Sequence, residues 1–459
     1  MSSEYDPRSV RYLCFADARR AFRNGSNTPR AFLEGCLSQI AEREPDVKAF
    51  VMVDTEGARR AADASTERWV RGTPISDVDG LPVAVKDCYD VRGWPTKVNS
   101  GLFDDRPAYV DAAHVDALRR GGAVIVGKTV TTELTMAAPG PTWNPWDLAR
   151  TPGGSSSGSA AAVAAGMVPF ATGSQVRGST IRPSSICGVI GMKPTHGAIN
   201  RNGGFDPQPS LNHIGLLGGT LTDVWEIGRY LARVAGPDPG CLPLTGSNLL
   251  PEPRKPCRFA RQYTAGWPLT DDVSKATFEA YLETLSEAGV EIIQPGASEE
   301  LSAYEAATAA VFEHHSVLMF WEARWPLRAL LDARPDGVSD TVRDYIARGE
   351  ALTEAEYRCA YARREELRAR HRDLNARVDG FITLAHIGPG QIGQPKVGTP
   401  WYCDASSSIG APSFNVPLLS VDGVPLGVQI MGFEGADADL AAIAHWMLSV
   451  QRAPDTGSV

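Results

Sequence analysis

The sequence predicts an α/β protein with a large, mixed, mostly parallel central sheet that helices cover on both faces. Three observations support this fold class. Short apolar runs rich in β-branched residues, such as "LPVAV" and "AVIV", alternate with helical patterns. Such runs are typical of strands buried within a layered α/β protein. A chain of 459 residues, 43% of them hydrophobic, is also long enough to bury a core of this size.

The elements follow one another in four segments. Residues 1–70 are expected to form a helical N-terminal arm, because Asn24-Gly25 resembles a helix C-cap and Thr28-Pro29 resembles an N-cap followed by proline. Strands and helices then alternate over residues 71–235. Long helical patterns fill residues 270–377, and residues 378–459 return to strands and a last helix. We see no internal repeat and no low-complexity linker, so the sequence predicts one domain with a helical insert.

The composition argues against several function classes. The net charge is −9 and no dense run of Lys and Arg is present, which disfavours a nucleic-acid binder. The eight cysteines include no C-x-x-C pair, so no metal site is expected, and they are interpreted as reduced thiols of a cytoplasmic protein. The start of the chain lacks an apolar signal core, and no stretch is apolar enough to cross a membrane.

Two familiar patterns are set aside. "GAVIVGKT", from Gly122 to Thr129, matches the phosphate-loop pattern, but its four variable residues are Ala-Val-Ile-Val and are expected to pair as a strand. The eight histidines form no H-E-x-x-H motif and none follows a G-x-S-x-G pattern. We interpret them as structural or surface residues, so the base of any hydrolase here is expected not to be histidine.

Lys86 is a candidate base. A lysine can take a proton from a serine only when it is neutral, which requires burial in an apolar site. Lys86 ends the apolar run "LPVAVK" and would project from a buried strand. The alternative is a structural lysine at a strand end, paired with Asp87 or Asp90.

The segment "TPGGSSSGSAAAVAAG" is rich in Gly and Ser and leads directly into an alanine-rich helix. A flexible linker would not continue into a helix in this way. An anion site at the helix N-terminus is another interpretation, and composition alone does not select a catalytic serine from the run.

Residues 150–197, which include this segment and "GSQVRGSTIRP", resemble the signature stretch of the amidase signature family. The similarity extends to "GLPVAVKDCYDVRGWPT" at residues 80–96 and to the tail "IGAPSFNVPLLSVDGVPLGVQIMG". It covers roughly the whole chain except the helical insert. The resemblance implies an amidohydrolase that cleaves the C–N bond of linear amides without a cofactor or metal.

The family uses a serine–cis-serine–lysine triad. By motif position, Ser179 resembles the nucleophile, Ser155 the bridging serine and Lys86 the base. The peptide bond into Ser155 would be cis, and Ser156 would support the loop. The resemblance also implies an oxyanion hole made by the backbone N–H groups of Val176, Arg177, Gly178 and Ser179.

The nucleophile segment departs from the common family pattern T-D-x-G-G-S-I-R. Gln175 replaces the aspartate, as in the malonamidase-like branch, where an arginine in the position of Arg182 is associated with a substrate carboxylate. Arg182 could instead pair with a core acid or carbonyl. Arg177 replaces a small residue, which would cost roughly 1 kcal/mol or more if the position needs a positive φ. Its side chain either supports the structure or binds an anion in the cleft.

The family layout suggests an acyl pocket that takes a planar or apolar group of an amide, anilide, hydrazide or ester. Trp321 and Trp325 are interpreted as core residues of a helix instead. The expected substrate-binding residues are Met136, with the segment "AAPGPTW" that follows it, and Arg177, Arg182, Phe205, Trp401 and Tyr402.

Two other functions stay open. The A-type glutaminase subunit of a tRNA-dependent amidotransferase shares this triad, although the short tail after Gly432 and the altered oxyanion turn disfavour it. A non-catalytic binding protein on the same fold is the other. The expected partner is a small amide-type molecule, with no nucleic acid and no membrane, and because relatives are often dimers, a homodimer is a further expectation.

Overall fold

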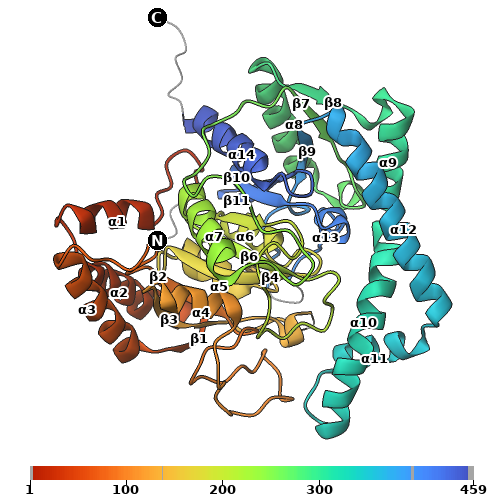
Figure 1. The fold of residues 1–459 in the computed structure, drawn as a ribbon. Coiled ribbons are helices and arrows are strands. Elements are labelled where there is room, and N and C mark those ends of the chain that lie inside the picture. Colours follow the sequence, from red (N-terminus) through yellow and green to blue (C-terminus); the bar gives the residue numbers. More distant parts are fainter. Residues whose placement is uncertain (1–3, 137, 394–396, 453–459) are drawn as a thin grey trace, which may run out of the picture.

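The computed structural model describes residues 4–136, 138–393 and 397–452. An eleven-stranded sheet runs through the centre of the molecule (Figure 1). In their order across the sheet, the strands are β1 (Phe50–Val53), β3 (Val124–Thr129), β2 (Pro82–Lys86), β4 (Phe170–Gln175), β6 (His213–Gly218), β5 (Ile190–Lys193), β10 (Ser413–Val421), β11 (Val424–Met431), β9 (Gly380–Leu384), β7 (Arg258–Arg261) and β8 (Glu291–Ile293).

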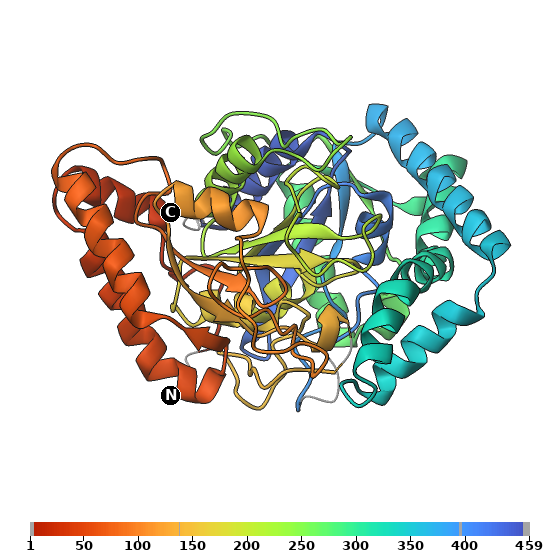
Figure 2. The ribbon, with the colours of Figure 1, turned by 60° about the horizontal axis from the view of Figure 1, so that its bottom comes forward.

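Helices surround this sheet. Figure 2 shows α2 and α3 along one side of the molecule and α10 to α12 along the opposite side. The helices are α1 (Phe15–Arg23), α2 (Pro29–Val47), α3 (Thr55–Val70), α4 (Ala113–Arg120), α5 (Ser157–Ala164), α6 (Ile181–Cys187), α7 (Leu221–Ala235), α8 (Asp272–Glu287), α9 (Glu299–Ala309), α10 (Val311–Ala333), α11 (Asp340–Ala351), α12 (Glu354–Asp373), α13 (Asp404–Ile409) and α14 (Asp437–Arg452).

Both faces of the sheet are buried. Successive strand residues point to opposite faces, and in the central strands both sets of side chains pack against helices. In β2, Val83 and Val85 join a cluster that contains residues of α4, α7 and α14. Ala84 between them joins a second cluster, formed with α2, α3 and α5. All residues of β2, β3 and β4 are buried, which explains the apolar stretches PVAV in β2 and VIV in β3. In β4 the buried residues include the polar Thr172, Ser174 and Gln175.

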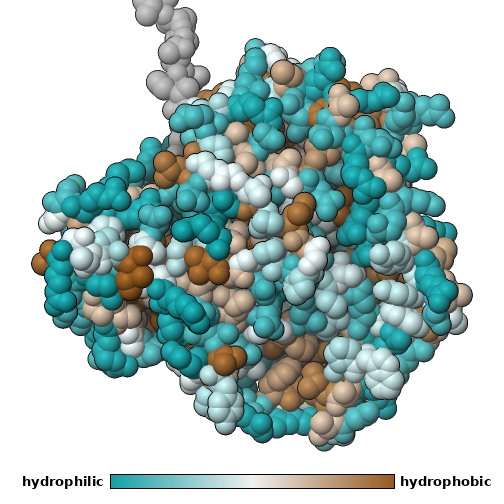
Figure 3. Space-filling model, viewed as in Figure 1, coloured by the Kyte–Doolittle hydropathy of each residue, from teal (hydrophilic) through white to brown (hydrophobic). Residues whose placement is uncertain are grey.

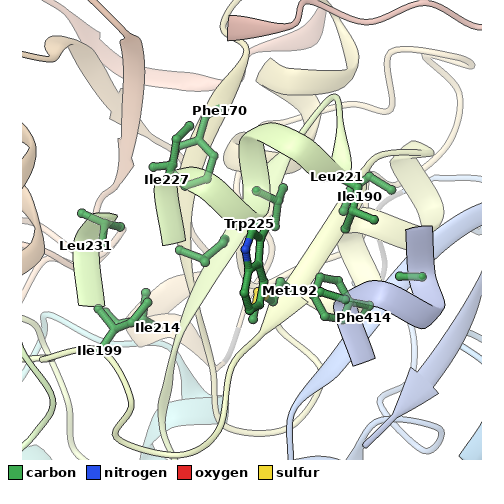
Figure 4. Close-up of a cluster of buried hydrophobic side chains, with 14 of the residues drawn as sticks. Phe170, Ile190, Met192, Ile199, Ile214, Leu221, Trp225, Ile227, Leu231 and Phe414 are labelled. Carbon is green, nitrogen blue, oxygen red and sulfur yellow. The ribbon is translucent and has the colours of Figure 1, made fainter. Parts of the chain in front are cut away.

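Helix α7 shows how one helix covers a face of the sheet. Thr220 caps it, since its side chain accepts a hydrogen bond from the N–H of Asp223. In Figure 4 the α7 side chains Leu221, Trp225, Ile227 and Leu231 lie among residues of β4, β5, β6 and β10. Trp225 is fully buried, and its Nε1 donates to the carbonyl oxygens of Ser247 and Leu249. Its large apolar surface is therefore removed from water without leaving the indole N–H unpaired.

The large mixed sheet was predicted correctly, but the expectation that it is mostly parallel was wrong. Of the ten strand pairings among the described residues, six are antiparallel and four are parallel. One cause is the hairpin between β10 and β11, which Asp422 and Gly423 connect with φ values of 52° and 70°. Positive φ at both central residues is typical of the two-residue turns that join antiparallel strands. The Asp-Gly pair in "VDGVP" was therefore a sequence signal for an antiparallel pair.

Several local predictions were confirmed. The side chain of Thr28 caps α2 by accepting from the N–H of Ala31 at 3.1 Å, and Pro29 is the first helical residue. The "GAVIVGKT" segment forms the buried strand β3. However, β1 lies within the segment expected to be a helical arm, and β8 lies within the helical insert. The core interpretation of Trp325 was also wrong, because its position on α10 faces solvent and 70% of its surface is exposed.

Candidate active site

Lys86 is the last residue of β2, and its side chain is fully buried. Its Nζ lies 2.8 Å from Oγ of Ser155 and 2.8 Å from Oγ of Ser174. Burial lowers the pKa of Lys86 to about 8, and the nearby Arg182 adds to this effect while Cys88 opposes it. The alternative pairing with Asp87 is not observed, because Asp87 forms an ion pair of 2.6 Å with Lys128 of β3.

Ser155 lies in the Gly/Ser-rich segment that leads into α5. The peptide bond between Gly154 and Ser155 is cis, as predicted. Arg182 of α6 donates through Nε to the carbonyl oxygen of Gly154 at 2.9 Å and through Nη1 to that of Gly398 at 3.1 Å. The Arg182 guanidinium is therefore held by carbonyl oxygens, which was the alternative to a role in binding a substrate carboxylate.

Ser179 lies in the turn between β4 and α6, and its side chain is almost buried. The Gln175 side chain organises this turn. Its Oε1 accepts from the N–H groups of Thr180 and Ile181, at 2.8 and 3.0 Å, and its Nε2 donates to Oγ of Ser407. The glutamine that replaces the family's aspartate thus accepts from the backbone at the start of α6.

Ser156 joins the two serine-bearing segments, as expected for a residue that supports the loop. Its N–H donates to the carbonyl oxygen of Ser179 at 3.1 Å, and its Oγ accepts from the N–H of Ser174 at 3.3 Å.

Arg177 is held by a fully buried carboxylate. Its Nε and Nη2 donate to the two carboxylate oxygens of Asp404, at 2.7 and 2.5 Å. The guanidinium carbon lies 4.1 Å from the ring centroid of Phe312 and 5.2 Å from that of Trp401. Bidentate pairing together with stacking on aromatic faces is a combination that lysine could not reproduce. Arg177 is not among the residues of the described chain that have a positive φ, so the strain considered for this position does not arise.

A cavity of about 470 Å³ opens beside Ser155 and Ser179. Of the expected substrate-binding residues, Met136, Arg177 and Arg182 line it. Ala137, which begins the "AAPGPTW" segment, lies outside the described residues, whereas Ala138 and Pro139 line the cavity.

Phe205, Trp401 and Tyr402, which were expected to contact substrate, are not among the described residues that line the cavity. Each of these rings is used elsewhere. Phe205 packs edge-on against Phe103, and Trp401 packs edge-on against Phe312. Tyr402 is buried, and its hydroxyl shares a hydrogen bond with Oγ1 of Thr270.

Sequence reasoning missed the opposite wall of the cavity, which α10 and α11 of the helical insert provide. Figure 3 shows apolar residues gathered in a hollow at the lower edge of the molecule, beside these helices. We find no local sequence signal for this wall, since Met319 and Phe320 pack in one apolar cluster and also line the cavity. The missed lining residues include Gln208, Phe312, Met319, Phe320, Thr341, Asp344, Tyr345 and Arg348.

The charged side chains that line the cavity, as far as the structure describes the chain, all have partners. Arg177 pairs with Asp404, and Arg182 donates to carbonyl oxygens. Asp344 and Arg348, one turn apart on α11, form an ion pair of 2.9 Å. Aromatic and apolar side chains supply much of the remaining wall.

No helix among the described residues has the length and apolar character that a membrane crossing requires.

Comparisons with known proteins agree with this geometry. A family model described as Amidase matches residues 31–441. The A subunits of glutamyl-tRNA(Gln) amidotransferase from Symbiobacterium thermophilum and Chloroflexus aggregans are 32% and 31% identical to the chain, over 94% and 95% of its length and 95% of theirs. A solved structure described as "Crystal structure of amidase" superimposes with a TM-score of 0.85 at 27% identity, covering 95% of this chain and all of that one. The malonamidase-like branch stays a prediction. The chain belongs to the amidase family.

Proposed function

We propose that this protein hydrolyses the C–N bond of a small carboxamide, or of a related anilide or hydrazide, through an acyl-enzyme on Ser179. The observation that carries the proposal is the position of Lys86. It is fully buried, its pKa is lowered to about 8 by burial, and it contacts Ser155 at the edge of a cavity that Ser179 also lines.

In the proposed reaction, neutral Lys86 takes the proton of Ser155 while Ser155 takes that of Ser179. Oγ of Ser179 then bonds to the amide carbon. As the tetrahedral intermediate collapses, the proton returns through Ser155 to the nitrogen, the C–N bond breaks, and the amine leaves. Water repeats the sequence on the ester, which releases the acid and restores Ser179.

The oxyanion would be stabilised by the backbone N–H groups of Val176, Arg177, Gly178 and Ser179. Among the described residues, none accepts a hydrogen bond from the N–H of Arg177, Gly178 or Ser179, so these donors remain available for a ligand. A donor that is already in place contributes about 3–4 kcal/mol to the transition state in other hydrolases.

The cavity supports a substrate with an uncharged, largely apolar acyl group. A free carboxylate or ammonium on that group would need an unpaired charge on the wall. Arg177 is paired with the buried Asp404, and the N–H donors of Arg182 are used by carbonyl oxygens, so neither guanidinium can bind a substrate carboxylate without losing existing contacts.

A second candidate function follows from the comparisons, namely the glutaminase A subunit of a tRNA-dependent amidotransferase. Both curated relatives carry the name of that subunit and match the chain over nearly its full length. The relatives thus support this candidate more strongly than a stand-alone amidase. Glutamine is a zwitterion, however, and its carboxylate would need a free cation, whereas the guanidiniums of Arg177 and Arg182 are engaged by Asp404 and by carbonyl oxygens.

The deciding experiment compares the purified chain with its Ser179→Ala variant on a panel of neutral amides, anilides and hydrazides, and on glutamine with and without partner subunits and tRNA. Turnover of neutral amides by the chain alone, lost in the variant, is expected. Glutamine hydrolysis only with partners and tRNA would establish the second candidate. Equal turnover by both proteins would show that the activity does not belong to Ser179. Binding without turnover of any compound would favour a non-catalytic protein.

A further inference from the structure

Among the neutral polar side chains that line the cavity, Gln208 and Tyr345 contact each other. Gln208 belongs to the segment before β6, whereas Tyr345 belongs to α11 of the helical insert. Nε2 of Gln208 donates a hydrogen bond to the hydroxyl oxygen of Tyr345 at 2.9 Å. This bond joins the catalytic core to the helical insert at the surface that a substrate would contact.

The positions of both groups are well defined by their surroundings. Gln208 is 2% exposed, and its main-chain carbonyl oxygen accepts from the N–H groups of Leu211 and Asn212, which fixes the backbone from which the amide extends. The Tyr345 ring packs edge-on against Phe320, with 4.5 Å between the ring centroids. The Tyr345 hydroxyl is therefore held at a fixed point of the wall by contacts on both sides.

The Tyr345 hydroxyl has one proton to donate, and the bond from Gln208 uses only a lone pair. Among the described residues, no acceptor for that proton is present. Burial raises the pKa of Tyr345, so the phenol keeps its proton at neutral pH. Accepting a bond from the amide also strengthens a hydroxyl as a donor.

We propose that Tyr345, positioned by Gln208, determines specificity by donating a hydrogen bond to a neutral acceptor on the acyl group of the substrate. The acceptor is an ether, ketone or hydroxyl oxygen on an otherwise apolar acyl chain. A carboxylate in this place is disfavoured, because Asp344, the residue before Tyr345 on α11, lines the same wall, and the lining cations Arg177 and Arg348 are paired with Asp404 and Asp344. The identification of the ligand as an amide rests on the proposed function, whereas the subsite itself rests on the Gln208–Tyr345 geometry.

The test uses pairs of ligands that differ only in the acceptor: 4-methoxyphenyl and 4-ethylphenyl alkanamides with one to three methylene groups. Their affinities are measured by calorimetry on the Ser179→Ala variant, which removes turnover from the comparison. We expect the methoxy compound of at least one chain length to bind about 10-fold more tightly than its ethyl counterpart, since one satisfied hydrogen bond accounts for a factor of this size.

Adding Tyr345→Phe should abolish this preference while leaving the affinity for the ethyl compound within about twofold, because the ring and its packing on Phe320 are retained. Gln208→Leu should reduce the preference by freeing the hydroxyl. Tyr357→Phe is the matched control, since Tyr357 lies in the same helical layer but stacks on Trp321. It should leave the preference unchanged.

Equal binding of both compounds at every chain length, or no binding of either, would overturn the proposal. A loss of affinity for both compounds in Tyr345→Phe would also overturn it, because that result indicates a purely structural role. Turnover by the wild-type chain is measured separately. Selective binding without turnover would refute the proposed function while leaving the subsite intact.

Discussion

Replacing each of two buried lysines on neighbouring strands with methionine should separate a catalytic lysine from a structural one. Lys86 of β2 and Lys128 of β3 are 0% and 1% exposed. They differ in their partners. Lys86 contacts two serine hydroxyls, whereas Lys128 contacts the carboxylate of Asp87 at 2.6 Å and two neutral oxygens.

The expected free energies follow from these partners. A lysine whose pKa falls from 10.5 to about 8 on folding destabilises the folded state by about 3 kcal/mol at pH values below 8. Lys86→Met removes that cost and loses two hydrogen bonds of about 1 kcal/mol each, so stability should be unchanged or slightly higher. Lys128→Met leaves Asp87 buried without its cation, which should cost about 3–5 kcal/mol.

The stability of the folded protein should also depend on pH through Lys86. Because the pKa of Lys86 is lower in the folded protein, the unfolded chain binds more protons between pH 8 and 10.5, and stability from this group rises with pH across that window. Any advantage of Lys86→Met at pH 7 should therefore disappear above pH 10.5.

Urea unfolding at pH 7 and amide hydrolysis are measured on both variants. We expect Lys86→Met to be inactive and as stable as the wild type, and Lys128→Met to be markedly less stable. The reasoning is refuted if Lys86→Met is as destabilised as Lys128→Met, or if it keeps wild-type activity.

Two further predictions concern the same site. The value of kcat/KM should rise as the pH increases and reach half its maximum near pH 8, because Lys86 must lose its proton to act as a base; a flat profile between pH 6 and 10 would exclude that role. Arg177→Met should lower the free energy of unfolding by about 3–5 kcal/mol, because it leaves Asp404 buried and unpaired. Adding Asp404→Asn should recover part of this loss in urea unfolding, and strictly additive losses would mean that the two residues do not stabilise each other.

The buried lysines also show how far the sequence could define the site. Lys86 is a candidate base by sequence because it ends a buried apolar run. Lys128 in "VIVGKT" and Lys193 in "IGMK" meet the same criterion, and the structure buries all three. Their partners separate them, since Lys128 pairs with Asp87 and Lys193 donates to the carbonyl oxygen of Ala411. Those partners are distant in sequence or lie in loops, so only the family resemblance distinguished Lys86 beforehand.

The cavity wall was less predictable for a related reason. Periodicity identified α10 and α11 as helices but could not show which residues face the core and which face a cavity. Tyr345 is one example, because its partner Gln208 is 137 residues away. The Arg177 side chain is another, since its ion pair with Asp404 spans 227 residues. Local patterns therefore located the strands and the serine segments, whereas the pocket depends on contacts that only folding creates.

The most direct test of the central claim is the site of covalent labelling by a fluorophosphonate, which reacts with an activated serine. Peptide mass mapping should find a single adduct on Ser179. Labelling should be absent in Ser179→Ala and strongly slowed in Ser155→Ala and Lys86→Met, because in the proposed relay Ser155 and Lys86 activate Ser179. An adduct on another serine, or equal labelling rates in Lys86→Met and the wild type, would contradict the proposed relay.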